Sequence, residues 1–144
     1  MKILLADNSI LILNRLQNIV LGYDKVTLTG MYRNGMDALI AMRETPPDLA
    51  IIDIKMPGIT GLEVLHEIRK ENKTMKIMFL TLYSSTHYRK KAMMDGADYF
   101  FSKAEDFDKI HLVIEEMLLT SRKPNNRPAV KQITLRSKTT IKPI

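Results

Sequence analysis

Short apolar runs alternate along this chain with longer stretches of mixed polar and apolar character. The runs are brief and nearly continuous in apolar residues, which is typical of strands buried on both faces of a sheet. They lie at residues 3–6, 26–31, 49–52, 77–80 and 99–101. We therefore predict five buried strands.

The stretches between these runs carry apolar side chains at the spacing of a helix face. The predicted faces contain Ile10, Leu13, Leu16, Ile19 and Val20 in the first stretch, Leu62, Leu65, Ile68 and Arg69 in a later one, and Ile110, Val113, Ile114, Met117 and Leu118 in the last. Turn-forming residues separate the units. Asn34-Gly35 and Met56-Pro57-Gly58 each precede a helical run, and Gly96 ends one.

The order of these elements indicates five consecutive βα repeats. Such alternation predicts an α/β fold in which a parallel sheet is covered by helices on both faces and joined by right-handed crossovers. The chain has 144 residues, which is a one-domain length. Ligands of such sheets bind at the carboxyl ends of the strands, so the candidate chemistry is expected there.

Charge divides the chain into a body and a tail. Residues 1–120 carry a net charge of −1, whereas residues 121–144 contain seven basic residues and no acid, which accounts for the overall +6. We expect a folded domain over 1–120 and a basic, disordered tail over 121–144. Binding of the tail to nucleic acid or to an acidic partner is the less favoured alternative, and the tail has no aromatic residue for base stacking.

Several common features are missing from the sequence. No apolar run approaches the roughly 20 residues needed to cross a bilayer, and the apolar start is too short for a signal peptide. The absence of cysteine excludes disulfides and thiolate metal sites. We expect a cytoplasmic protein without a membrane association.

Polar residues follow four of the predicted strands. Asp7 and Asn8 follow the first strand, Asp53 the third, Thr81 the fourth and Lys103 the fifth. Because the carboxyl ends of parallel strands lie at one edge of a sheet, these side chains are expected to converge. Taken singly, each has an ordinary explanation: Asp53 could cap a turn, and Asn8 or Ser9 could cap a helix.

The set has a coherent chemistry. Carboxylate and amide oxygens suit a hard cation such as Mg²⁺. A carboxylate beside that metal can attack phosphorus as a nucleophile, while a lysine and a hydroxyl share the charge of the transferred group. Asp53 is the best candidate for the nucleophile, because Met56-Pro57-Gly58 turns the chain sharply just after it.

The ordered set of motifs resembles the receiver domain of two-component response regulators, the CheY-like superfamily. The resemblance spans residues 1–120 and rests on Asp7-Asn8, Asp53-Ile54-Lys55-Met56-Pro57-Gly58, Thr81, Gly96-Ala97-Asp98 and Lys103. It implies a flavodoxin-like (βα)5 doubly wound fold with a central five-stranded parallel sheet. It also implies that a histidine kinase or phosphotransfer protein phosphorylates Asp53 with the help of Mg²⁺.

The resemblance assigns roles to individual residues. The Mg²⁺ ligands would be Asp7, Asn8, Asp53 and the backbone carbonyl of Lys55. Thr81 and an aromatic residue on the fifth strand, here Phe100, would switch a partner-binding face made by the fourth helix, fifth strand and fifth helix. No enzyme activity is implied beyond phosphorylation and dephosphorylation of Asp53 itself.

Four residues depart from the family pattern, one of them Ala104, which follows Lys103 where the family often has proline. Asn8 replaces a second acid, so weaker Mg²⁺ binding is expected. Leu82 stands where a small residue is usual and is expected to narrow access to Asp53. Phe100 lacks the hydroxyl of the usual tyrosine, and a purely structural role in the core is an equal alternative for it.

Four functions remain open from the sequence. The first is a stand-alone receiver that acts through protein partners. The second is a DNA-binding response regulator cut short, although this chain alone contains no helix-turn-helix pattern after residue 120. The third is a degenerate receiver that serves as a constitutive docking module, as Asn8 and Leu82 would favour. The fourth, a small enzyme or flavin-binding protein, leaves Thr81 and Lys103 unexplained.

Overall fold

The computed structural model describes residues 1–121. Five parallel strands form one sheet in the order β2-β1-β3-β4-β5. They are β1 (Lys2–Ala6), β2 (Thr27–Tyr32), β3 (Leu49–Ile52), β4 (Lys76–Thr81) and β5 (Tyr99–Ser102). Each strand matches a predicted run to within one residue at either end. The predicted doubly wound (βα)5 fold with a central parallel sheet is therefore confirmed.

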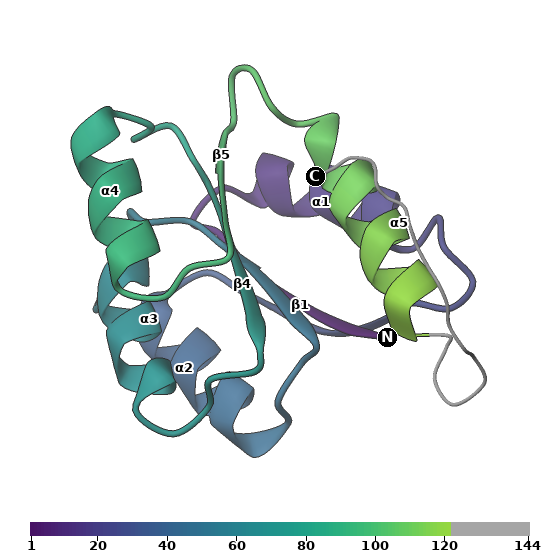
Figure 1. Cartoon of the computed structure of the whole chain (residues 1–144), viewed down its shortest axis with the longest axis horizontal. Coiled ribbons are helices and arrows are strands. Elements are labelled where there is room, and N and C mark those ends of the chain that lie inside the picture. The colour runs from purple at the N-terminus through teal and green to yellow at the C-terminus, as the bar shows by residue number, and fades with distance from the viewer. Residues whose placement is uncertain (122–144) are drawn as a thin grey trace. The chain divides into compact units, whose positions relative to one another are not determined.

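Five helices alternate with the strands. They are α1 (Ile10–Val20), α2 (Gly35–Glu44), α3 (Gly61–Arg69), α4 (Thr86–Met94) and α5 (Lys109–Ser121). Figure 1 shows α2, α3 and α4 on one side of the sheet and α1 on the other. The chain divides into two units by its contacts, and the boundary between them falls within α5, after Leu112.

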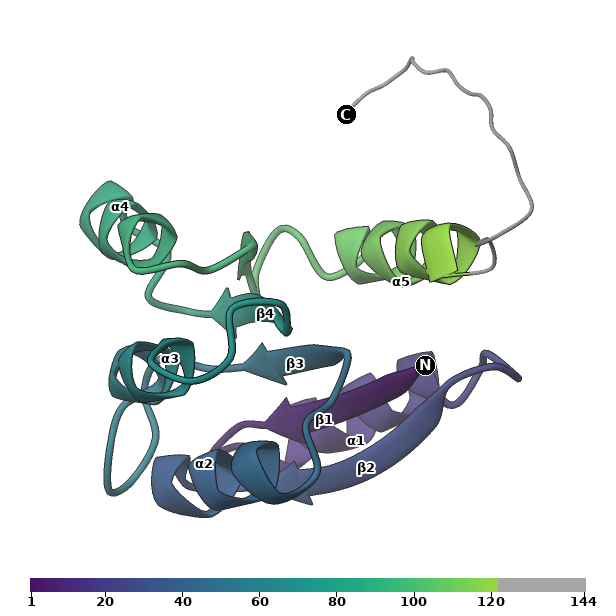
Figure 2. The same ribbon diagram turned by 60° about the horizontal axis from the view of Figure 1, so that its bottom comes forward.

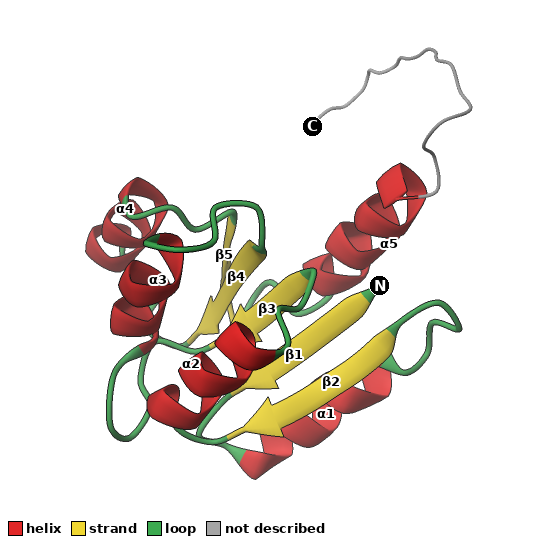
Figure 3. Cartoon of the chain, turned by 90° about the horizontal axis from the view of Figure 1, so that it is seen from below, coloured by secondary structure: helices red, strands yellow, loops and turns green. Residues whose placement is uncertain are grey.

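All strands end at one edge of the sheet, as the arrowheads in Figure 3 show. The loops that leave this edge lead into helices whose first turns are capped by side chains. Ser9, Asn34, Thr60 and Ser85 each accept a hydrogen bond from a backbone N–H in the first turn. Ser9, rather than Asn8, is thus the cap of α1, and its side chain satisfies an amide that the helix leaves unpaired.

Glycines with positive φ occupy two turns of the fold. Gly58, in the loop between β3 and α3, has φ of 80°, and Gly96, just after α4, has φ of 109°. Residues with a Cβ rarely adopt such values, so glycine suits both positions. The predicted sharp turn after Asp53 and the predicted end of a helix at Gly96 are both present.

The helices bury only part of the predicted apolar faces. In α1, Leu13, Leu16 and Val20 are buried, but Ile10 is 53% exposed. The prediction for Ile10 is therefore wrong. Ile10 is the first residue of α1, immediately after the Ser9 cap. It has the spacing of the buried face, but the sheet does not cover this end of the helix.

The hydrophobic core between the sheet and α2, α3 and α4 holds the carboxyl ends of the strands in place. α2 and α3 contact each other, and Figure 2 shows both on the same side of β1 and β3. Leu39 of α2 and Leu65 of α3 are buried there together with Ile52 and Phe79 of the neighbouring strands. Burial of such side chains stabilises a fold by roughly 1.5–3 kcal/mol each, which fixes the strand ends firmly.

The last predictions to compare with the structure concern membrane-spanning helices and the basic tail. Among residues 1–121, no helix has the length and apolar character needed to cross a bilayer. The basic tail lies almost entirely outside the described residues, since the structure describes nothing of 122–144. The domain boundary at residue 120 and the disorder of the tail stay predictions.

Candidate functional site

Backbone hydrogen bonds tie the strand ends together at the carboxyl edge of the sheet. The amide of Asp7 donates to the Tyr32 carbonyl at 2.9 Å, and the amide of Asp53 donates to the Ala6 carbonyl at 3.0 Å. The residues that follow β1 and β3 are therefore held beside their neighbouring strands, so the two acidic side chains leave the sheet from adjacent positions.

Lys103, which follows β5, joins the two acids. Its Nζ lies 2.7 Å from Oδ2 of Asp7 and 2.8 Å from Oδ2 of Asp53. The three side chains are 8%, 3% and 7% exposed in the order Lys103, Asp7, Asp53. One ammonium thus neutralises one of two buried carboxylates, which leaves this part of the site with a net negative charge.

Asp53 is anchored through its backbone and both carboxylate oxygens. Oδ1 accepts a hydrogen bond from the Ile54 amide at 2.7 Å, and Oδ2 accepts from Lys103. The start of α3 packs closely against the backbone of Asp53, because a Cβ at Gly61 would overlap the Asp53 carbonyl oxygen. Carboxylate oxygens have further lone pairs, so Asp53 can still bind a metal or attack an electrophile.

Burial and hydrogen bonding act in opposite directions on the pKa of Asp7. Burial raises the pKa of this carboxyl above its usual 3.8, although hydrogen bonds from Lys103 and the Ser9 amide offset part of the effect. For Lys103, burial alone would lower the pKa, but hydrogen bonds to Asp53 and Asp7 outweigh it and raise the pKa above 10.5. Lys103 is therefore a permanent cation at physiological pH.

Thr81 ends β4 next to the same edge. Its backbone carbonyl accepts from the Lys103 amide at 2.9 Å, and its buried hydroxyl oxygen accepts from the Tyr83 amide at 3.0 Å. The hydroxyl hydrogen remains available to donate. Leu82 is 68% exposed, so most of its side chain lies in solvent. The ring of Tyr83 lies 5.8 Å from Nζ of Lys55, which brings the loops after β4 and β3 together.

Phe100 is buried in the core between β5 and α4. Its ring lies 6.2 Å from that of Phe79, and the guanidinium carbon of Arg89 lies 4.9 Å from its centroid. Arg89 also donates to the Phe100 carbonyl at 3.0 Å. Nothing in the local sequence pattern indicates this contact. A single arginine in a helix carries no signal for a partner on a strand.

A family model for the response regulator receiver domain matches residues 3–115. The chain belongs to this family. The resemblance drawn from Asp53, Lys103 and their companions is thus confirmed, and the chain contains a receiver domain of two-component systems.

Relatives of the receiver domain include transcriptional regulators. The transcriptional regulatory protein ZraR of Klebsiella oxytoca is 35% identical over 121 residues, which are 83% of this chain and 27% of that protein. A putative transcriptional regulator of Pseudomonas aeruginosa is 34% identical over 95 residues, which are 66% of this chain and 46% of that protein. This chain therefore spans about a quarter to a half of these relatives.

Solved structures of similar fold include further response regulators. A DNA-binding response regulator of the LuxR family from Staphylococcus aureus is 27% identical with a TM-score of 0.74, over 80% of this chain and 96% of that one. A CheX–CheY–BeF₃–Mg²⁺ complex from Borrelia burgdorferi matches with a TM-score of 0.74 at 20% identity, over 82% and 89% of the chains. The second likeness shows the fold alone.

Receiver domains of this kind generally use Mg²⁺, and the oxygen atoms at this edge fit a hard cation. Asp7 and Asp53 already share one cation, the ammonium of Lys103, through one oxygen each. Among residues 1–121, no group of three or more acidic, histidine or cysteine side chains is close enough to hold a metal. The donors that the structure brings together are the carboxylates of Asp7 and Asp53. The family resemblance adds the Asn8 amide and the Lys55 carbonyl as candidates.

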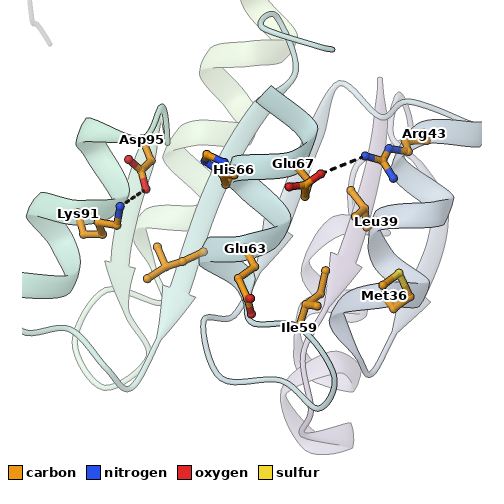
Figure 4. Close-up of a pocket in the computed structure, with 10 residues that line it drawn as sticks. Met36, Leu39, Arg43, Ile59, Glu63, His66, Glu67, Lys91 and Asp95 are labelled. Carbon is orange, nitrogen blue, oxygen red and sulfur yellow. Dashed lines mark ion pairs between the residues drawn. The ribbon is translucent and has the colours of Figure 1, made fainter. Parts of the chain in front are cut away.

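A separate hollow lies between α2, α3 and α4 of the receiver. Figure 4 shows its apolar floor and the ion pairs at its rim, and its volume is about 540 Å³. The lining includes Met36, Leu39, Arg43, Ile59, Glu63, His66, Glu67, Lys91 and Asp95. Because no predicted site residue lines it, this hollow is distinct from the carboxylate–lysine site.

Proposed function

We propose that this receiver is a phospho-acceptor and that Asp53 takes the phosphoryl group. The observation that carries the proposal is the Lys103 ammonium, which bridges the buried carboxylates of Asp7 and Asp53. A nucleophilic carboxylate needs a nearby cation that is fixed before the reaction, so that the charge on phosphorus is compensated without reorganisation. Lys103 meets this need.

The transfer is a displacement at phosphorus. A carboxylate oxygen of Asp53 forms a bond to phosphorus, and the bond between phosphorus and the donor's histidine nitrogen breaks, leaving its electron pair on that nitrogen. Dephosphorylation follows when water attacks phosphorus and the carboxylate leaves as inorganic phosphate forms. The Thr81 hydroxyl is expected to donate a hydrogen bond to a phosphoryl oxygen.

Asp7, Asn8, Asp53 and the Lys55 carbonyl would hold Mg²⁺. When bound, this ion supplies positive charge that shields the phosphoryl oxygens and the acids from one another. Because Asn8 contributes an amide in place of a second acid, binding of the ion is expected to be weaker than at a site with three carboxylates.

The output is a change on the partner-binding face that α4, β5 and α5 are expected to provide. A hydrogen bond from Thr81 to the phosphoryl group would draw the loop after β4 towards Asp53 and shift a pre-existing equilibrium of α4. Phe100, whose ring and carbonyl contact Arg89 of α4, is the residue of β5 expected to take part in this shift. A sensor histidine kinase or phosphotransfer protein would supply the phosphoryl group, and a protein partner would read the altered surface.

Further expectations follow from this function. The receiver acts as a switch in the cytoplasm, and its only chemistry is phosphorylation and dephosphorylation of its own Asp53. The relatives are transcriptional regulators, yet this chain alone is not expected to bind nucleic acid. A docking module that works without phosphate is the second candidate, because Asn8 removes one of the usual acids.

Intact-mass spectrometry distinguishes these two functions. The protein is incubated with Mg²⁺ and acetyl phosphate, and the added mass of one phosphoryl group is followed over time. We expect the addition in the wild type and in Asp48→Asn, a control that removes an exposed acid, and none in Asp53→Asn. A wild type that gains no mass at any Mg²⁺ concentration would support the docking module instead.

A further inference from the structure

Arg33 lies at the same edge of the sheet as the acids. It directly follows β2, as Asp7 directly follows β1, and the two strands pair with Ala6 opposite Tyr32. The Asp7 amide donates to the Tyr32 carbonyl at 2.9 Å. Arg33 is therefore the cation that the neighbouring strand places next to the first acidic loop.

A hydrogen bond fixes the guanidinium of Arg33 beside Asn8. Its Nη2 donates to the Asn8 backbone carbonyl at 3.2 Å. Within residues 1–121, no carboxylate forms an ion pair with Arg33, and its side chain is exposed. A guanidinium carries five N–H donors, so donors are left for an incoming anion.

Inclusion of Arg33 cancels the net negative charge of the site. Asp7 and Asp53 each contribute one negative charge, and Lys103 and Arg33 each contribute one positive charge. Lys55 adds a third cation on the loop after β3, where its Nζ lies 5.8 Å from the Tyr83 ring. Because Asn8 is neutral where an acid is usual, these five charged side chains together carry a net positive charge. A positive charge favours the binding of anions and disfavours the binding of metal cations.

We propose that Arg33 is a recognition residue for the phosphoryl group and shares the charge compensation that Mg²⁺ supplies. Its guanidinium attracts the tetrahedral anion of the donor towards Asp53 and, by the same charge, weakens binding of the metal alone. This inference rests on the proposed phosphorylation of Asp53. It assigns to Arg33 the part of the charge compensation of the phosphoryl group that weaker Mg²⁺ binding beside Asn8 would leave unmet.

A purely structural role for Arg33 makes a different prediction. If the guanidinium only held the loop after β1 through the Asn8 carbonyl, its removal would loosen the loop and weaken binding of metal and anion together. Charge recognition instead moves the two affinities in opposite directions. The test therefore measures both.

The experiment compares Arg33→Gln with wild type and with Lys25→Gln. Lys25 is an exposed cation that precedes β2, at the opposite edge of the sheet, and makes a matched control for the loss of one charge. Mg²⁺ alone is titrated by amide NMR at low ionic strength. Beryllofluoride, a phosphoryl mimic, is then titrated at saturating Mg²⁺, and bound fluorine is observed by NMR.

We expect Arg33→Gln to bind Mg²⁺ about threefold more tightly and beryllofluoride about threefold to tenfold more weakly, consistent with one unit charge at short range in a partly solvated site. Lys25→Gln should match the wild type in both. Equal affinities in Arg33→Gln and Lys25→Gln, or a loss of both affinities in Arg33→Gln, would overturn the role of Arg33. If the wild type itself fails to bind beryllofluoride, the proposed phosphorylation fails instead.

Discussion

Nζ of Lys103 lies 2.8 Å from Oδ2 of Asp53, although the two residues are 50 positions apart in the sequence. The same ammonium lies 2.7 Å from Asp7, so a single lysine serves two acids that are both buried. The proposed chemistry of this receiver depends on that arrangement, and it also makes the stability of the fold sensitive to charge at the site.

Removal of Lys103 is expected to destabilise the protein. Lys103→Gln leaves two buried carboxylates without their cation, and we expect a loss of about 2 kcal/mol in the free energy of unfolding at pH 7. The loss should shrink at pH 5, because the raised pKa of Asp7 allows this carboxyl to take up a proton more easily. Urea unfolding at both pH values measures the difference.

Lys70→Gln is the matched control for Lys103. Lys70 is 58% exposed and pairs at 2.9 Å with Glu67, which is 37% exposed. Exposed pairs contribute roughly 0–1 kcal/mol, so the control should lose much less. Equal losses in the two variants would contradict a special role for the buried cation.

Asp7→Asn is expected to stabilise the protein at neutral pH. The pKa of Asp7 is raised by burial, so the folded state holds a proton on this carboxyl more tightly than the unfolded state does. Stability therefore falls as pH rises from 3.8 through the folded pKa, and the cost is fully present above it. Substitution with asparagine should recover about 1 kcal/mol at pH 7.

The gain from Asp7→Asn should vanish in acid. Well below pH 3.8 the Asp7 carboxyl of the wild type is neutral in the folded and the unfolded state. Its ionisation should then cause no difference in the free energy of unfolding between the wild type and Asp7→Asn. Thermal unfolding across the pH range checks the prediction, with Asp24→Asn, at an exposed acid, as a control. A stabilisation that does not change with pH would show that the ionisation of Asp7 is not its cause.

Arg89 is expected to couple α4 to β5. Arg89→Ala removes both the contact with the Phe100 ring and the hydrogen bond to the Phe100 carbonyl, and we expect a cost of about 1 kcal/mol. Amide hydrogen exchange should become faster in α4. Lys90→Ala, at the exposed neighbouring position, should change neither quantity. If both alanine variants behave alike, the Arg89–Phe100 contact does not hold the helix.

Gly61 is expected to tolerate no side chain. Its Cβ would overlap the Asp53 carbonyl and lie 2.9 Å from the Phe79 ring, so Gly61→Ala should cost about 2 kcal/mol and slow phosphorylation of Asp53. Gly22→Ala provides the comparison, because its Cβ would come no nearer than 3.2 Å to the Ile19 carbonyl. Denaturant unfolding and the rate of mass addition are measured together. Equal losses of stability and equal rates of phosphorylation in Gly61→Ala and Gly22→Ala would refute the close packing at Asp53.

The strands and the convergence of Asp7, Asp53 and Lys103 were predictable from the sequence. Buried parallel strands produce continuous apolar runs, and the direction of the chain then places the residue after each run at a common edge. The prediction failed at Ile10, because helical spacing records a face of the helix but not where the sheet beneath it ends. It also missed Val64, which is buried beside Leu65 in α3.

Arg33 and Arg89 were not predictable in the same way. Each is an arginine with no motif around it, and its contact depends on which strands or helices are neighbours. The pairing of β2 with β1 brings Arg33 to Asn8, and the packing of α4 against β5 brings Arg89 to Phe100. Strand order and packing arise from the whole chain, so a local pattern does not record them.

The central claim is that Asp53 itself receives the phosphoryl group, and residue-level chemical trapping tests it most directly. The protein is treated with Mg²⁺ and acetyl phosphate, and sodium borohydride then reduces the aspartyl phosphate to homoserine. Peptide mapping by mass spectrometry locates the reduced residue. We predict homoserine at position 53 and at no other aspartate. Homoserine at a different aspartate, or none at position 53 under conditions that phosphorylate the protein, would contradict the account.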